Sequence, residues 1–264
     1  MKLKLALILA TAVLLAGCSD TGGGAGPATP TGAAPAGATS AGGTLTVFAA
    51  ASLTDAFTQL GDRFKAAHPG VTVEFNFAAS SALREQIIGG APADVFASAN
   101  ESNMTQVVDA GLATGPTPFV TNVLQIAVPS DNPGQVAGLS DFGKAELLIG
   151  LCAEEVPCGQ FGLEALANAG VTPSIDTNEP DVRSLLTKVE NGDLDAGIVY
   201  HTDVLAAGDA VRGIEIPAGQ NVVATYPIVA LSGSGHADLA TAFVGYVRSP
   251  AGQRVLESFG FGPA

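Results

Sequence analysis

A predicted strand that runs directly into a helix, residues 44–57, constrains the fold of this chain more than any other stretch. Leu45, Val47 and Phe48 form an apolar run that favours a buried β-strand. Three alanines follow, and Ser52 stands where a helix N-cap is expected. The N–H groups that begin a helix lack intrahelical acceptors and carry its positive dipole end, so such a junction can bind an anion. The simpler interpretation, in which Ser52 only caps the helix, stays open on this pattern alone.

Strands and helices alternate along the rest of the folded sequence. Residues 71–77 alternate apolar and polar side chains, as a half-buried strand does, and Ser80 begins the helix that follows. Further apolar runs at 147–149 and 196–200 predict strands between helical segments. This alternation predicts an α/β fold with a largely parallel sheet, in which ligands bind beyond the carboxyl ends of the strands.

Two apolar runs, residues 119–129 and 222–231, are long for single strands. Strands of this length can cross between two sheets, and a pair of them would form a hinge. They can equally lie within one sheet, and the pattern does not separate the two arrangements.

Five positions share a place at a predicted strand-to-helix junction and offer uncharged donors: Ser52, Ser80, Cys158, Val182 and Tyr200. Donors without acceptors suit a fully deprotonated oxyanion. A protonated phosphate would also need an acceptor, and a buried hydroxyl left unpaired costs about 1–3 kcal/mol. The pattern therefore predicts a dianion such as sulfate or molybdate rather than phosphate.

The charge of the chain argues against several other functions. With 25 acidic and 11 basic residues, a formal net charge of −14, the surface repels nucleic-acid backbones. An anion site must then be built from local dipoles. The three histidines are scattered, and no Gly-x-Ser-x-Gly motif occurs, so neither direct metal ligation by side chains nor a catalytic residue set is predicted.

The first 17 residues have the pattern of a targeting signal. Two lysines precede an apolar stretch, residues 5–16, that is too short for an ordinary membrane span. The sequence Leu-Ala-Gly-Cys at 15–18 resembles the lipobox of bacterial lipoproteins, which implies cleavage after residue 17 and a lipid on Cys18. Residues 18–43 are almost entirely Gly, Ala, Pro, Thr and Ser and cannot form a core, which predicts a disordered tether for an extracytoplasmic domain held at the cell membrane. An ordinary secreted protein with a chance cysteine is the alternative.

Two cysteines, Cys152 and Cys158, remain if Cys18 carries lipid. An even pair on one loop of an extracytoplasmic protein predicts a disulfide. Zinc binding is a weak alternative, because two thiolates with no histidine nearby fall short of four ligands.

Several segments together resemble the molybdate-binding proteins of bacterial ABC importers. They are Thr46–Thr54, Phe77–Ser81, Gly90–Phe96, Val156–Gly159, Asp181–Arg183, Gly197–Tyr200 and Tyr226–Pro227. The resemblance implies an α/β, two-domain periplasmic-binding-protein fold of type II. Each domain would hold a mixed, mostly parallel sheet flanked by helices, with two crossover strands as hinge. Lobe 1 would comprise residues 44–121 plus 226–264, and lobe 2 residues 122–225.

The resemblance also implies a function and a set of contacts. The chain would capture molybdate, and tungstate as well, as a monomer, and deliver it to the permease subunits of an ABC transporter, with no cofactor and no enzymatic step. Ser52 and Ser80 would donate hydroxyl and backbone hydrogen bonds, Cys158 and Val182 backbone N–H groups, and Tyr200 its phenol. Cys158 departs from the family pattern, where a small residue such as alanine is common. A binding protein for another oxyanion such as sulfate is the alternative; an extracytoplasmic serine hydrolase is a further one, and it would need a base near a serine.

Overall fold

The computed structural model describes residues 42–264. The predicted signal peptide (1–17), the lipidation of Cys18 and the tether up to residue 41 lie outside the described residues. Gly43, predicted as the last tether residue, already opens the first strand.

Nine strands and eight α-helices, joined by three short 3₁₀ turns, make up the described part of the chain. The strands are β1 (Gly43–Ala50), β2 (Val71–Ala78), β3 (Val95–Ala97), β4 (Thr117–Pro129), β5 (Ile149–Cys152), β6 (Thr177–Glu179), β7 (Ala196–Tyr200), β8 (Val211–Glu215) and β9 (Val223–Ala230). The α-helices are α1 (Thr54–Ala67), α2 (Ser80–Ile88), α3 (Glu101–Asp109), α4 (Pro157–Asn168), α5 (Val182–Glu190), α6 (His201–Ala207), α7 (Ala237–Arg248) and α8 (Pro250–Ser258). The 3₁₀ turns are η1 (Ala51–Leu53), η2 (Leu139–Gly143) and η3 (Gly208–Ala210).

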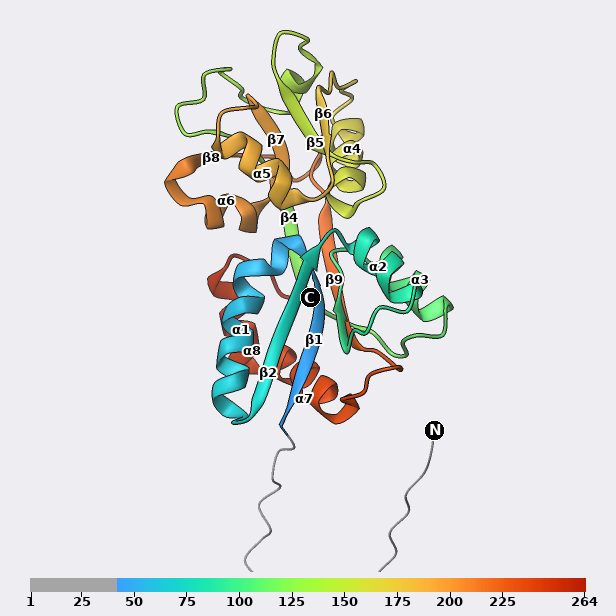
Figure 1. Cartoon of the computed structure of the whole chain (residues 1–264). Coiled ribbons are helices and arrows are strands. Elements are labelled where there is room, and N and C mark those ends of the chain that lie inside the picture. The colour runs from blue at the N-terminus through green and yellow to red at the C-terminus, as the bar shows by residue number, and fades with distance from the viewer. Residues whose placement is uncertain (1–41) are drawn as a thin grey trace, which may run out of the picture. The chain divides into compact units, whose positions relative to one another are not determined.

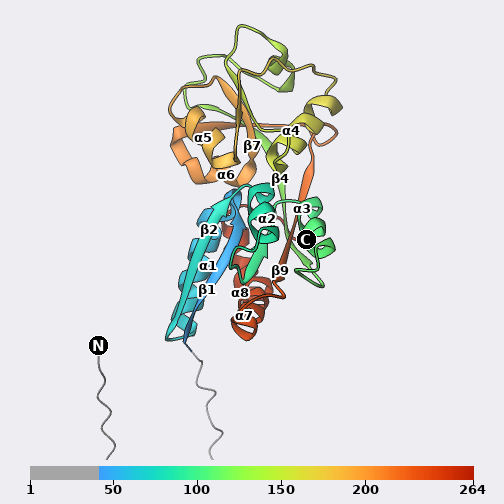
Figure 2. The same ribbon diagram turned by 45° about the vertical axis from the view of Figure 1, so that its right-hand side comes forward.

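The strands follow the order β2-β1-β3-β9-β4-β7-β5-β6, with β8 paired to β4. In what we call lobe 1, β1 pairs in parallel with β2 and β3, and β9 runs antiparallel to β3. In lobe 2, β5 pairs in parallel with β6 and β7. Figures 1 and 2 show lobe 2 with α4–α6 above and lobe 1 with α1–α3, α7 and α8 below. The predicted α/β class with mixed sheets flanked by helices is confirmed.

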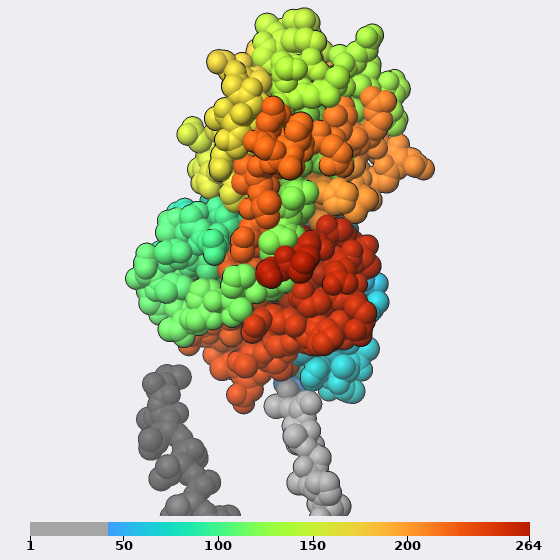
Figure 3. All heavy atoms as spheres, turned by 180° about the vertical axis from the view of Figure 1, so that it is seen from behind, coloured from blue at the N-terminus to red at the C-terminus, as the bar shows by residue number. Residues whose placement is uncertain are grey.

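β4 links the two sets of strands. Its residues up to Val123 pair with β9, and from Leu124 onward it pairs with β7 and β8. Just before β9, the side chain of Asn221 bonds to the backbone of β4 as a neighbouring strand would. Asn221 Oδ1 accepts from Leu124 N–H, and Asn221 Nδ2 donates to Leu124 O. Viewed from behind, the orange segment entering β9 and green β4 pass together between the two lobes (Figure 3). The residue boundaries given above for the lobes stay a prediction.

Successive residues of a strand point to opposite faces of the sheet. In β1 apolar side chains point to both faces, so helices pack on both faces of the lobe 1 sheet. Val47 packs in the cluster that includes α1 and α7, whereas its neighbour Phe48 packs against α2 and α3. In α1, Phe57, Leu60 and Phe64 lie at helical spacing and are buried against the sheet. None of the described helices has the length and apolar content needed to cross a membrane.

Candidate functional site

A small cavity lies where four helical N-termini from both lobes converge. All five predicted site residues line it: Ser52, Ser80, Cys158, Val182 and Tyr200. The other lining residues are Ala50, Ala51, Ala79, Ala99, Pro157 and Asp181. Its volume is about 20 Å³, against roughly 10–15 Å³ for a single water site and some 300–1,000 Å³ for pockets that bind larger organic ligands. The cavity therefore has room for a small ion and not for a sugar or peptide.

Ser52 is not the helix cap that its sequence position suggests. It lies inside η1, the α-helix begins only at Thr54, and no side chain caps that turn. Its hydroxyl instead lies 2.9 Å from Tyr226 Oη, a partner 174 residues away. The capping interpretation is therefore wrong, and the hydroxyl is held at the cavity wall by a tertiary contact.

Ser80 is the first residue of α2. Its Oγ accepts the backbone N–H of Ala99, at 2.9 Å, from the loop that follows β3. This bond uses an acceptor position of the hydroxyl, so its proton is free to point into the cavity. Because Ser80 opens the helix, its own N–H also has no intrahelical acceptor.

Cys158 is the second residue of α4, behind Pro157. A disulfide joins it to Cys152 at the end of β5, with the two Cα atoms 5.7 Å apart. The turn is tight, because a Cβ on the next residue, Gly159, would lie 1.9 Å from Ala153 O. The disulfide and this glycine together fix the start of α4, where the Cys158 N–H has no intrahelical acceptor.

We expect the paired substitution C152S/C158S to lower the free energy of unfolding by about 2 kcal/mol, because a short closed loop restricts the unfolded chain only modestly. Urea denaturation without reductant measures this difference. Added dithiothreitol should lower the midpoint of the wild-type protein and leave that of the paired variant unchanged. Equal midpoints for the two proteins without reductant would contradict a stabilising disulfide.

Val182 begins α5, and Asp181 caps this helix. Asp181 Oδ1 accepts from the N–H groups of Arg183 and Ser184, at 2.8 and 2.9 Å. Asp181 Oδ1 is thus already hydrogen-bonded to the first turn of its own helix. The N–H of Val182 precedes the capped groups and has no intrahelical acceptor. The helix therefore offers this one donor to the cavity.

Tyr200, at the end of β7, brings a side-chain donor to the cavity. The residue is only 1% exposed, and its Oη has no hydrogen-bond partner among the described residues. Burial, reinforced by nearby Tyr226 and Asp203, raises the pKa of Tyr200 well above its ordinary value, so the phenol stays protonated. An unpaired buried hydroxyl costs about 1–3 kcal/mol, and a bound acceptor would remove that cost.

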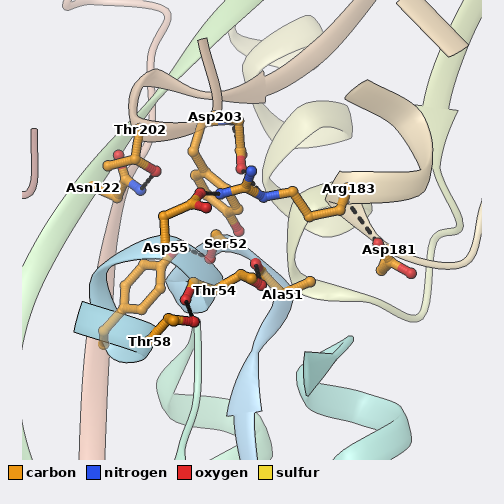
Figure 4. A network of polar contacts seen from close by, with 12 residues as sticks. Ala51, Ser52, Thr54, Asp55, Thr58, Asn122, Asp181, Arg183, Thr202 and Asp203 are labelled. Atoms are coloured by element: carbon orange, nitrogen blue, oxygen red, sulfur yellow. Dashed lines mark hydrogen bonds and ion pairs between the residues drawn. The ribbon is translucent and has the colours of Figure 1, made fainter. Parts of the chain in front are cut away.

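Charged groups surround the cavity without pointing a free cation into it. Arg183 lies beside it and reaches two carboxylates: Nη2 donates to Asp55 Oδ2 of α1 at 2.6 Å, and Nε lies 3.0 Å from Asp203 Oδ1 of α6 (Figure 4). The guanidinium thereby links lobe 2 to lobe 1. Among the lining residues Asp181 alone carries a charge. The expectation that neutral dipoles, not bulk positive charge, form the site agrees with this arrangement.

Asp203 is fully buried beneath this ion pair. Its Oδ2 accepts the N–H of Tyr200 at 3.0 Å. Burial raises the pKa of Asp203 to about 6, although the positive charge of Arg183 and this hydrogen bond act in the opposite direction. The carboxylate thus supports the backbone of Tyr200 at the cost of a buried charge.

The sequence located all five positions that meet at the cavity, but it missed the residues behind them. Tyr226 and Arg183 stood in segments that carried the family resemblance, yet nothing in their local pattern assigned them a role. Asp55 and Asp203 look like ordinary acids near helix starts. Their contacts join segments 128 and 20 residues apart, which no local pattern predicts.

The cavity lacks the base that a serine hydrolase needs. No histidine or lysine is among the lining residues, and the hydroxyl partner of Ser52 is a phenol. A nucleophilic serine requires a base within hydrogen-bond reach. Within residues 42–264, no group of three or more His, Cys, Asp or Glu side chains gathers as a metal site.

Comparison with known proteins relates the chain to solute-binding proteins. The family of bacterial extracellular solute-binding proteins matches residues 45–262. The molybdate-binding protein ModA of Mycobacterium tuberculosis is 39% identical over 254 residues, which cover 96% of this chain and 95% of that protein. A putative ABC transporter substrate-binding lipoprotein of Bacillus subtilis, YvgL, is 32% identical over 83% of this chain and 86% of its own length.

Among solved structures, the sulfate-binding protein SubI of Mycobacterium tuberculosis shares the fold. The TM-score is 0.75 at 20% sequence identity, over 84% of this chain and 87% of that protein. At this level of identity, the likeness concerns the fold alone.

Proposed function

The chain belongs to the bacterial extracellular solute-binding proteins, and from this premise we propose that it captures molybdate between its two lobes for an ABC transporter. The observation that carries the proposal is the unpartnered, buried hydroxyl of Tyr200 in a cavity lined by uncharged donors. A dianion would supply the acceptor that this hydroxyl lacks. Hydrogen bonds to a charged group contribute about 1.5–3 kcal/mol each, so a few of them suffice for tight binding.

The donor set favours a fully deprotonated tetrahedral anion. The proposed contacts are the hydroxyls of Ser52, Ser80 and Tyr200 and the N–H groups of Cys158 and Val182. The one carboxylate at the cavity, Asp181, is occupied by its own helix, so a P–OH group would find no free carboxylate acceptor. We place molybdate ahead of sulfate because the relative named for molybdate is 39% identical, whereas the sulfate-binding neighbour shares 20%.

The remaining parts of the proposal concern the setting of the domain. We propose that tungstate binds at the same site, that Cys18 carries a lipid, and that the folded domain works as a monomer outside the cytoplasm. The lipobox-like sequence and the lipoprotein name of YvgL support the lipid on Cys18 and the location outside the cytoplasm. Delivery to the permease subunits of the transporter would follow lobe opening. Binding and release involve no chemical step and no cofactor.

We expect molybdate to bind the purified domain with one ion per chain, and phosphate not to bind, in parallel calorimetric titrations. Molybdate at a hundred times its dissociation constant should stabilise the protein by about 2.7 kcal/mol, seen as a rise in Tm. Phosphate at the same concentration is the control for ionic strength. No heat of binding and no Tm shift with molybdate would overturn the proposal.

Sulfate is the second candidate, because the fold is shared with a sulfate-binding protein. Sulfate and molybdate would meet the same donors, and they differ in size. Competition between them decides the matter. Displacement of bound molybdate by equimolar sulfate would make sulfate the better assignment.

A further inference from the structure

Tyr226, on β9, lies behind the cavity and contacts two of the proposed donors without lining the cavity itself. Its Oη is 2.9 Å from Ser52 Oγ. Its ring packs edge to face on Tyr200, with centroids 6.0 Å apart, and on Phe261 at 5.8 Å. Tyr226 is fully buried, so its phenol is held in one place between these rings.

The chemistry of the pair sets the direction of the bond. A phenol is a stronger donor than an aliphatic alcohol, and an alcohol oxygen is the better acceptor. Burial raises the pKa of Tyr226, so the phenol keeps its proton. Ser52 Oγ, at 2.9 Å, is its partner by hydrogen-bond geometry, and Asn122 and Tyr200 are also near enough to influence its pKa. By geometry alone, either hydroxyl can donate in this pair. We take Tyr226 as the donor because a phenol is the stronger donor, which leaves the proton of Ser52 to point elsewhere.

Ser80, the other serine that lines the cavity, shows a similar arrangement. Its Oγ accepts from Ala99 N–H, so its oxygen too is engaged from behind. In both serines a fixed donor occupies the oxygen and leaves the hydroxyl proton for the cavity. One serine is fixed by the backbone and the other by a side chain, and the side chain can be changed by mutation.

We propose that Tyr226 is a positioning residue that holds the Ser52 hydroxyl as a donor to the bound oxyanion. The inference rests on the proposed function, because it needs an anion in the cavity. A donor into Ser52 Oγ also polarises the serine O–H and strengthens its bond to the ligand. Tyr226 does not line the cavity, so its effect on affinity passes through the two donors that it contacts, Ser52 and Tyr200. A positioning role toward Ser52 requires that most of this effect depend on Ser52.

A double-mutant cycle with molybdate tests this dependence. We expect Tyr226→Phe, which keeps the ring, to weaken binding about tenfold in the wild-type background, and Ser52→Ala to weaken it about tenfold to a hundredfold. In the S52A background, Tyr226→Phe should change the dissociation constant less than twofold. In the Y200F background, where Ser52 is intact, it should again cost about tenfold.

Tyr246→Phe is the matched control, because that ring packs on Phe64 away from the cavity; its affinity should equal that of the wild type. The Tm of each variant without ligand, with circular dichroism, identifies folding defects. An equal loss on Tyr226→Phe with and without Ser52, or no loss at all, would overturn the positioning role while leaving the proposed function standing. If the wild-type protein did not bind molybdate, the proposed function itself would fall and this role with it.

Discussion

Val182→Pro should weaken molybdate binding by about tenfold to a hundredfold while the protein stays folded. The substitution removes one backbone N–H from the cavity, and a hydrogen bond to a charged ligand contributes about 1.5–3 kcal/mol. Val182 is the first residue of α5, where proline is well tolerated because that N–H has no intrahelical acceptor. Asp181 before it is extended, at φ −159° and ψ 170°, which is compatible with a following proline.

The comparison with Val182→Ala isolates the backbone donor. Alanine keeps the N–H and shortens the side chain, so its affinity should remain within a few-fold of the wild type. Calorimetry gives both dissociation constants, and urea denaturation without ligand checks that the V182P protein is folded. If V182P bound molybdate as tightly as V182A, the N–H of Val182 would not be a ligand contact.

Local patterns predicted the parts of this site that local structure makes. Ser80 and Val182 begin helices and Cys158 is the second residue of one, and proline and capping residues mark such places in the sequence. Tyr200 was likewise readable as the end of an apolar strand. Because the carboxyl ends of strands gather at one edge, the sequence also predicted that these residues share a site.

Tertiary contacts account for what the sequence did not predict. Ser52 has the residue type and position of a cap, but the partner that fixes it, Tyr226, comes from a strand near the end of the chain. The long run at 119–129 was ambiguous because a crossing strand and an ordinary long strand are equally apolar. The change of partner at Leu124 depends on strands that follow later in the chain. Neither feature leaves a periodic signal.

Arg183→Ala should lower the free energy of unfolding by about 3–5 kcal/mol at pH 8, because it leaves Asp203 as a buried carboxylate without its cation. Asp203 has 0% exposure, and Arg183 Nε lies 3.0 Å from it. Asp55, the second partner, is 43% exposed, so Asp55→Asn should cost less than about 1 kcal/mol. Urea denaturation at pH 8 gives the free energies of unfolding of the two variants. If both ion pairs of Arg183 contributed equally to stability, this contrast would not appear.

The stability that Arg183→Ala removes should be larger at high pH than at low pH. The pKa of Asp203 is raised from 3.8 to about 6 in the folded protein, so its contribution to stability is complete below about pH 4 and is lost as pH rises through 6. Removing the positive charge of Arg183 raises this pKa further. The wild-type protein and R183A then both hold a neutral Asp203 at pH 5 and differ most at pH 8. We therefore expect the stability difference to grow from pH 5 to pH 8.

Combining Arg183→Ala with Asp203→Asn separates the buried charge from other effects of losing the arginine. The amide oxygen introduced at position 203 can still accept from Tyr200 N–H, so the backbone support of the site is kept. With no carboxylate left to ionise, the R183A/D203N protein should recover most of the stability that R183A loses at pH 8. Its stability difference from D203N alone should be the same at pH 5 and pH 8. A stability loss in R183A that is equal at both pH values, or that D203N does not relieve, would mean that Arg183 acts through packing and not by compensating the charge of Asp203.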